Sequence, residues 1–331
     1  MEMLVQAPTH TCRLGALLGG DEAVAIGGHR GMGANLLAGP YARATRYREN
    51  TIKSFNTAAA HGASFIEFDV QVTADGVPVI WHDDVVVTGE SGRTIRRPIK
   101  DLTLSEFKGL SSLSARNALL RDFELEGGYR AAASVAWQCA EEDELPTLAE
   151  VFQQVPTQIG FDIEVKMTTP DHVPTTTAGE VDRVVGAILD EVQHISKHSR
   201  RTLVFSSFDP EVCAALRARQ TQWPVMFLSA GGVDEHCDAR RTSIDAAIGF
   251  ALGTGLQGII LDAGALHAQQ HMAGLARSKG LHVYTYGLQN DDPEWVRQQY
   301  MIGVQGAICD DVSHVASVVP QMIAAAPALR A

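Results

Sequence analysis

Short apolar segments rich in β-branched residues alternate with longer amphipathic segments along most of the chain. The apolar segments are typical of buried strands, and the amphipathic ones are typical of helices that cover them. Such an alternation predicts parallel strands joined by helical crossovers. The strand pattern occurs in nine segments: 23–28, 64–72, 77–81, 159–166, 202–206, 225–228, 258–261, 282–286 and 306–309. Helical periodicity occurs at 49–61, 147–155, 178–194, 210–220, 243–252, 266–278 and 293–301.

We therefore expect an α/β protein, a (β/α)8 TIM barrel with insertions on the C-terminal rim of the barrel. The chain has 331 residues, and a barrel of this size is commonly one domain. We expect a single domain over 1–331, with a core at about 23–320 and an N-terminal extension at 1–22. Nine strand candidates exceed the eight barrel places, and we expect the sixth or seventh candidate to be the extra one.

Two segments interrupt the alternation of strands and helices. Residues 35–48 directly follow the first strand, and residues 111–145 separate the third and fourth strand candidates. Loops that follow barrel strands build the active site, so both segments are interpreted as insertions on the functional rim. For 111–145, plain surface elaboration is an equally good interpretation. Before it, Thr103 and Glu106 have the spacing of a helix capping box.

The second strand candidate carries two acidic residues in an apolar run. Glu67 and Asp69 are two positions apart, so their side chains share one face of the strand. Inside a barrel, two unpaired carboxylates repel one another and are costly to desolvate. A divalent cation held by oxygen ligands removes that cost, which predicts a site for Mg²⁺, Ca²⁺ or Mn²⁺ rather than zinc. The alternative interpretation is a solvated strand face.

The fourth strand candidate repeats this arrangement. Asp162, Glu164 and Lys166 alternate with apolar residues. Glu164 would add a third carboxylate, and Lys166 would supply a cation for a phosphate oxygen. An internal salt bridge between Glu164 and Lys166 is the structural alternative.

Two of the 12 histidines stand out by position. His29 and His82 each directly follow a predicted parallel strand, where the catalytic side chains of barrels project. Histidine exchanges protons near neutral pH, so two of them beside a metal suit displacement at a phosphodiester. Arg30 adds a planar donor for phosphate.

These residues lie in segments that closely resemble the glycerophosphodiester phosphodiesterase family. The segments are GHRG at 28–31, ENT at 49–51, EFDV at 67–70 and PVIWHD at 78–83. The likeness is to the soluble, plant-type eukaryotic branch and extends over most of 24–310. The resemblance implies a function as well as a fold. The implied reaction converts glycerophosphodiesters such as glycerophosphocholine, glycerophosphoethanolamine or glycerophosphoinositol to sn-glycerol 3-phosphate and an alcohol.

The resemblance implies a role for each site residue. Glu67, Asp69 and Glu164 would hold one divalent cation, with Mg²⁺ ahead of Ca²⁺ and Mn²⁺. His29 and His82 would be the acid–base pair, without an assignment of which is acid, and the glycerol 2-hydroxyl would attack first to give a cyclic phosphate. Further residues would bind phosphate (Arg30, Lys166) or complete or orient the metal shell (Glu49).

The late segment 284–290 departs from the W-T-x-N motif of many family members. The resemblance places Tyr286 where others have the tryptophan, near the substrate, which leaves the preferred alcohol open. Phe208 is a second rim candidate, for which core packing is the more ordinary interpretation.

Composition limits the classes of partner and the cellular compartments that we expect for this chain. The net charge of -12 argues against nucleic acid as a partner. No apolar run reaches the length of a membrane span, and the oligomeric state is left open. The five cysteines, without a C-x-x-C pair, favour a reducing compartment. We expect a cytoplasmic protein, with a plastid as the alternative.

Two other functions are compatible with the same barrel. One is a lysophospholipase D, which would need an apolar groove or a membrane-touching loop. The other is a non-catalytic sensor of glycerophosphodiesters, which should lack one of the acid–base or metal groups. Because all of those groups are present, hydrolysis is the leading hypothesis.

Overall fold

The computed structural model describes residues 24–35, 46–90, 93–114, 116–124, 130–167, 172–197 and 200–325. The predicted N-terminal extension at 1–22 and most of the predicted loop at 35–48 lie outside these residues. None of the helices in the described ranges is long and apolar enough to cross a bilayer.

Eight parallel strands form a closed barrel. Each strand pairs with two neighbours, and the barrel closes where the first strand, which also pairs with the last, pairs with the second. The predicted (β/α)8 fold is thereby confirmed. The strands are β1 (Ala25–His29), β2 (Phe65–Val72), β8 (Gly160–Val165), β9 (Leu203–Ser207), β10 (Val225–Ser229), β11 (Gly258–Asp262), β12 (His282–Tyr286) and β13 (Gly306–Cys309).

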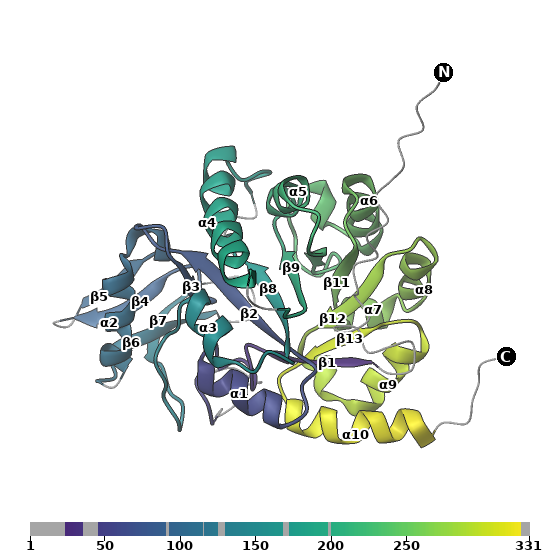
Figure 1. Ribbon diagram of the computed structural model, residues 1–331, viewed down its shortest axis with the longest axis horizontal. Coiled ribbons are helices and arrows are strands. Elements are labelled where there is room, and N and C mark those ends of the chain that lie inside the picture. The colour runs from purple at the N-terminus through teal and green to yellow at the C-terminus, as the bar shows by residue number, and fades with distance from the viewer. Residues whose placement is uncertain are drawn as a thin grey trace.

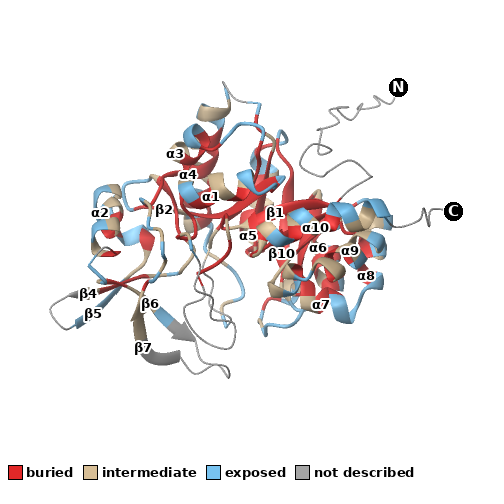
Figure 2. Cartoon of the chain, turned by 90° about the horizontal axis from the view of Figure 1, so that it is seen from below, coloured by how far each residue is buried: buried red, intermediate tan, exposed pale blue. Residues whose placement is uncertain are grey.

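Helices surround the barrel, as Figure 1 shows. They bury their apolar faces against the strands, and Figure 2 shows buried residues concentrated along the strands and on the inner sides of the helices. The outer helices are α1 (Ile52–Ala60), α3 (Leu148–Gln154), α4 (Ala178–Ser196), α5 (Pro210–Arg219), α6 (Ile244–Thr254), α8 (His271–Ser278), α9 (Pro293–Met301) and α10 (Val312–Ala325). Shorter segments are α7 (Ala263–Ala268), η3 (Ala239–Arg241) and η4 (Leu288–Asp291).

Alternation along β2 separates two apolar cores. Ile66, Phe68 and Val70 pack outward against the helices, whereas Phe65 lies in the smaller core inside the barrel. Gly27 on the neighbouring β1 makes room for Phe65, since a Cβ at this position would come within 2.3 Å of the ring. The face that carries Phe65 also carries Glu67 and Asp69, so alternation turns both carboxylates into the barrel.

The third strand candidate is not part of the barrel. Segment 77–81 contains β3 (Pro78–Ile80), which pairs with β2 in the antiparallel direction through a tight turn. The expectation that the sixth or seventh candidate is the extra one was wrong, because β10 and β11 both occupy barrel places. The reason is chain length: a parallel return to the barrel needs a crossover of a dozen or more residues, and only a hairpin fits between 72 and 78.

Residues 73–147, called the insertion below, connect β2 to α3. Besides β3, they form an antiparallel sheet with the order β5-β4-β6-β7, placed to one side of the barrel in Figure 1. Trp81, Phe107 and Trp137 belong to its own apolar core. The predicted insertion at 111–145 covers only its second half. Its elements are β4 (Val86–Glu90), β5 (Arg93–Arg97), η2 (Ile99–Asp101), α2 (Leu104–Ser114), β6 (Leu119–Glu124) and β7 (Arg130–Ala136).

The predicted capping box at the start of α2 is confirmed. The backbone N–H of Glu106 donates to Thr103 Oγ1 at 3.3 Å, and the backbone N–H of Thr103 donates to Glu106 Oε2 at 2.8 Å. Two N–H groups that the first helical turn cannot pair are satisfied in this way. The box also orients α2 against the sheet of the insertion.

Candidate functional site

Three buried carboxylates converge inside the barrel near the carboxyl ends of β2 and β8. Asp69 and Glu164 are direct neighbours in the pairing of these strands, and Glu67 lies one pleat below Asp69. One oxygen of each of Glu67, Asp69 and Glu164 lies within 4.8 Å of the others. Sequence alternation predicted this group, and it is called the carboxylate cluster below.

The cluster is electrostatically costly without a cation. Burial, together with Asp69 and Glu164, raises the pKa of Glu67 well above its usual value. Burial also raises the pKa of Glu164, in spite of the nearby Lys166 ammonium. Asp69 Oδ1 is buried and makes no hydrogen bond within the described part of the chain. Three hard oxygen donors with this surplus of negative charge fit a divalent cation, so the cluster is able to hold one.

Two cationic side chains border the cluster. Lys166 Nζ lies 3.0 Å from Glu164 Oε1 and 3.4 Å from Asp69 Oδ1. Arg30 has a left-handed backbone, with φ of 48°, and its N–H donates to Glu67 Oε2 at 3.0 Å. Its Nε lies 3.5 Å from Asp69 Oδ2. Burial alone would raise the pKa of Asp69, but Lys166, His82 and Arg30 outweigh it and hold that pKa below its usual value.

Glu49 lies beside Arg30 rather than within the carboxylate cluster. Its Oε1 accepts from Arg30 Nη1 at 3.0 Å. Burial opposes its ionisation, yet the Arg121 and Arg30 guanidinium groups lower its pKa to about 2. The side chain is therefore charged and fixes the guanidinium of Arg30 in place. Glu49 thus orients Arg30 and is not one of the three carboxylates of the cluster.

His29 ends β1 and is oriented by Asp310, which directly follows the neighbouring strand β13. Its Nδ1 donates to Asp310 Oδ1 at 2.7 Å, which leaves Nε2 as the ring nitrogen available for chemistry. Burial would raise the pKa of Asp310, but His29 and the backbone N–H of Ala34 lower it to about 2. The pair thus consists of an ionised carboxylate and an imidazole held by barrel residues.

His82 reaches the same rim by a different route. It follows the antiparallel β3, so the expectation that it ends a parallel strand was wrong. The hairpin folds back over the rim, and the backbone N–H of Trp81 donates to the Asp69 carbonyl at 3.0 Å. His82 Nδ1 lies 2.9 Å from Asp83 Oδ1. Burial, together with the nearby Arg30 guanidinium, lowers the pKa of His82 well below its usual value, so its neutral form prevails.

A half-buried arginine of the insertion links these groups. Arg121 on β6 donates to Asp83 Oδ1 at 2.6 Å and to Glu49 Oε2 at 3.2 Å. Its guanidinium lies over the Trp137 ring, 4.5 Å from the centroid. One side chain of the insertion therefore links the carboxylate beside His82 with the carboxylate beside Arg30.

Comparison with known proteins assigns the chain to a family. Residues 29–314 match the model of the glycerophosphoryl diester phosphodiesterase family. The chain belongs to this family. The chloroplastic glycerophosphodiester phosphodiesterase GDPD1 of Arabidopsis thaliana is 35% identical over 89% of this chain and 80% of the relative. The expected glycerophosphodiester phosphodiesterase class and the plant-type likeness are thereby confirmed.

More distant members share the barrel. The human glycerophosphocholine phosphodiesterase GPCPD1 is 30% identical and covers 86% of this chain, which spans 43% of that protein. A Silicibacter pomeroyi structure, titled as a putative glycerophosphoryl diester phosphodiesterase, covers 93% of this chain and 97% of its own, with a TM-score of 0.64 and 23% identity. An Oleispira antarctica phosphodiesterase, solved with the product sn-glycerol-3-phosphate, covers 88% and 95% with a TM-score of 0.61 and 18% identity.

In this glycerophosphoryl diester phosphodiesterase, two rings lie at the mouth of the barrel. Phe208 and Tyr286 have centroids 5.6 Å apart with perpendicular planes, and both pack on the apolar core inside the barrel. Burial raises the pKa of Tyr286 well above its usual value, so its hydroxyl stays protonated. The two rings thus close the β9–β12 side of the mouth, where the sequence placed them as rim candidates.

Three residues of the site escaped the sequence interpretation. Asp310 directly follows the last strand. A position at the end of a barrel strand is the same signal that singled out His29. Asn50, with φ of 57°, donates to Asp69 Oδ2 at 2.8 Å, and it lies in the ENT segment that was quoted only for its glutamate. Arg121 carries no signal in the sequence, because its partners are 72 and 38 residues away.

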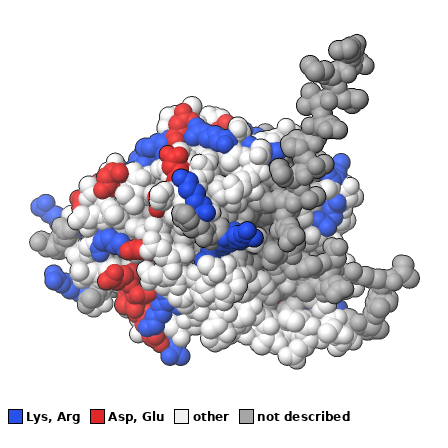
Figure 3. Space-filling view, in the orientation of Figure 1, with Lys and Arg blue, Asp and Glu red and all other residues white. Residues whose placement is uncertain are grey.

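The displayed surface has no single dominant charge. Figure 3 shows acidic and basic side chains interspersed on this face, on the side of the insertion. The positive charge beside the carboxylate cluster is local and comes from Arg30 and Lys166.

Proposed function

We propose that the protein hydrolyses glycerophosphodiesters to sn-glycerol 3-phosphate and an alcohol, in a reaction that depends on a divalent cation. The observation that carries this proposal is the position of His29 and His82 at the same rim as the carboxylate cluster. Each histidine uses Nδ1 for a carboxylate partner and retains Nε2 for proton transfer. The relatives named for glycerophosphodiesters and glycerophosphocholine support this substrate class.

The division of roles follows from the contacts. Glu67, Asp69 and Glu164 would hold the cation, with Mg²⁺ preferred over Ca²⁺ and Mn²⁺. When bound, the cation would neutralise charge on the phosphate oxygens. Arg30 and Lys166 stand beside those oxygens as positive charges and orient the diester. Glu49 fixes Arg30 from behind.

Proton transfer is assigned to the two histidines. In the first step one takes the proton of the attacking glycerol 2-hydroxyl, and the other gives a proton to the departing alkoxide. Water then opens the resulting cyclic phosphate to sn-glycerol 3-phosphate, with the two histidines in exchanged roles. The depressed pKa of His82 favours its neutral form, which suits a base. His29 donates from Nδ1 to the ionised Asp310, which holds its ring in place, and it takes the remaining role of acid. We assign the roles accordingly.

The test is release of glycerol 3-phosphate from a panel of glycerophosphodiesters with Mg²⁺, Ca²⁺ or Mn²⁺ added singly. We expect turnover with at least one ion, loss of turnover in EDTA and recovery when the ion is restored. Full activity in EDTA would refute the metal dependence. Binding of the diester without release of product would instead support the sensor alternative.

Lysophosphatidylcholine belongs in the same panel. The lysophospholipase D alternative predicts faster turnover of this substrate than of glycerophosphocholine, whereas the present proposal predicts the reverse. Cellular fractionation would test the expected cytoplasmic location against a plastid, which the chloroplastic name of the Arabidopsis relative makes the natural alternative.

A further inference from the structure

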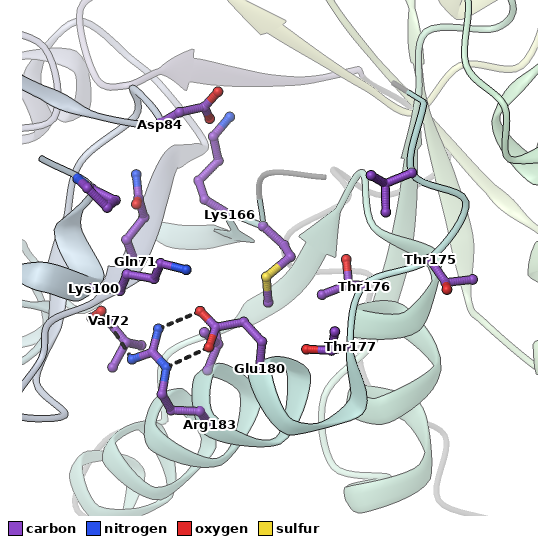
Figure 4. Close-up of a pocket in the computed structure, with 14 residues that line it drawn as sticks. Gln71, Val72, Asp84, Lys100, Lys166, Thr175, Thr176, Thr177, Glu180 and Arg183 are labelled. Atoms are coloured by element: carbon purple, nitrogen blue, oxygen red, sulfur yellow. Dashed lines mark hydrogen bonds and ion pairs between the residues drawn. The ribbon is translucent and has the colours of Figure 1, made fainter. Parts of the chain in front are cut away.

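A cavity adjoins the carboxylate cluster at the carboxyl ends of β2 and β8. It has a volume of about 370 Å³ and lies between the end of β2, the end of β8, the start of α4 and η2 of the insertion. Figure 4 shows its lining. Lys166 belongs both to this cavity and to the border of the cluster. Lys166 therefore connects the cavity with the carboxylate cluster.

The substrate geometry calls for two separate subsites. The two ester oxygens of a phosphodiester leave phosphorus in different directions, so the glycerol and the alcohol contact different walls. The glycerol is small and common to all glycerophosphodiesters, which suits the corner closed by Phe208 and Tyr286. The alcohol varies in size, and the open cavity accommodates that variation.

An ion pair between Arg183 and Glu180 forms the floor of the cavity. Arg183 Nη2 and Nε donate to the two oxygens of Glu180 at 2.8 and 3.0 Å. Arg183 Nη1 also donates to the Val72 carbonyl at 3.3 Å, which fastens α4 to the end of β2. This pair supports the cavity rather than offering a net charge to a ligand.

The walls offer hydrogen-bond donors. Lys100 comes from the insertion, and Figure 4 shows its ammonium pointing into the cavity. Thr177 precedes α4 but makes no capping hydrogen bond with its side chain, and its hydroxyl is turned toward the cavity in the same view. An ammonium and hydroxyl groups bind alcohol oxygens well.

The described residues that line the cavity include no aromatic ring. Quaternary ammonium groups are recognised by the faces of aromatic rings and cannot donate a hydrogen bond. The lining carries three cationic side chains, Lys100, Lys166 and Arg183, against two carboxylates, Asp84 and Glu180, so such a group would in addition meet a net repulsion. A polyhydroxyl alcohol meets neither obstacle.

We propose that this cavity is the alcohol subsite and that it selects polyhydroxyl alcohols, such as inositol or glycerol, over choline. The inference rests on the proposed hydrolysis, whose site it shares through Lys166. Lys100 and Thr177 are its specificity-determining residues, and Lys100 sets the discrimination against a positive head group.

The test compares kcat/KM for glycerophosphoinositol and glycerophosphocholine in the wild type and in Lys100→Glu. We expect the wild type to favour the inositol diester, and Lys100→Glu to shift the ratio toward choline on the order of tenfold, since a repelling charge becomes an attracting one. Thr177→Val should lower kcat/KM for the inositol diester alone. Lys279→Glu, at an exposed position after α8 and outside the cavity lining, is the matched control and should leave the ratio unchanged.

The outcomes separate the two proposals. A wild type that turns over neither diester with any divalent ion refutes the proposed function. An active wild type that prefers glycerophosphocholine overturns the subsite inference alone. An active Lys100→Glu variant with an unchanged ratio does the same. Because Lys100 is exposed, the variant is expected to fold, and its thermal unfolding temperature checks this directly.

Discussion

The two histidines of the site are oriented by two different bodies of the molecule. His29 and its partner Asp310 both stand at the ends of adjacent barrel strands, β1 and β13. His82 and its partner Asp83 belong to the insertion, and Arg121 holds that carboxylate from a strand of the insertion sheet. The proposed acid–base pair is therefore complete only when the insertion is seated on the barrel.

The difference shows how the barrel and the insertion each position a histidine. On the barrel, the ends of two paired strands bring His29 and Asp310 side by side, and one hydrogen bond between them orients the ring. On the insertion, the half-buried guanidinium of Arg121 donates to Asp83 of the insertion and to Glu49 of the barrel, and these hydrogen bonds position both carboxylates. A barrel-borne group should thus tolerate loss of its partner better than an insertion-borne one.

Removing either histidine should produce the largest effect. We expect His29→Ala and His82→Ala each to lower kcat by about 10²- to 10⁴-fold, because each removes one proton-transfer step. Since the two act as a unit, the double variant should lose little more than the worse single one. The measurement is glycerol 3-phosphate release at saturating substrate and cation.

The exposed His61 at the end of α1 is the matched control, and His61→Ala should stay within twofold of the wild type. Circular dichroism melting should show that all variants fold. Full activity in either site variant would remove that histidine from the mechanism and, with it, the proposed pair.

The barrel part of this comparison was predictable from sequence. Alternation along 64–72 and 159–166 is a local property, and it correctly turned Glu67, Asp69 and Glu164 inward. The direction of β3 was predictable too, because five residues between 72 and 78 do not permit a parallel crossover. The pattern of apolar residues alone does not reveal strand direction.

The insertion part was not predictable in the same way. Arg121 lies in a strand with mixed charges, and nothing near it in sequence indicates that its partners are Glu49 and Asp83. Such contacts depend on how a separate sheet packs against the barrel. Long-range ion pairs therefore have to be read from the structure.

Arg121 provides the sharpest test of the insertion's role. We expect Arg121→Met to lower kcat by about 10- to 100-fold with a smaller change in KM, because Asp83 and Glu49 lose the group that positions them. Arg121→Lys should rescue only part of the loss, since an ammonium cannot reproduce the planar fork that bridges two carboxylates. Steady-state kinetics of the three proteins provides the comparison.

Arg96 is the matched control on the same sheet. It makes two hydrogen bonds with Asp122, but both side chains are largely exposed, so Arg96→Met should change kcat by less than twofold. A purely structural Arg121 would give a different result: the Arg121→Met variant would melt earlier yet keep the wild-type kcat wherever it is folded.

The smallest effect is expected on the barrel side, from Asp310→Asn. The folded-state pKa of Asp310 is about 2, against 3.8 in the unfolded chain. Because the pKa is lowered on folding, the carboxylate contributes stability above about pH 4 and loses it as the pH falls through about 2. The shift corresponds to at most about 2 kcal/mol.

Urea unfolding at a series of pH values tests this expectation. Asp310→Asn should lower the free energy of unfolding at pH 6, and its difference from the wild type should shrink as the pH falls from about 4 toward 2. A double-mutant cycle with His29→Gln isolates the pair from other effects of the substitution. An equal deficit at pH 6 and pH 3 would mean that Asp310 contributes through packing rather than charge. The barrel would then hold His29 in place by strand pairing and packing, and its contrast with His82, whose partner Asp83 is held by Arg121, would be greater than the contacts indicate.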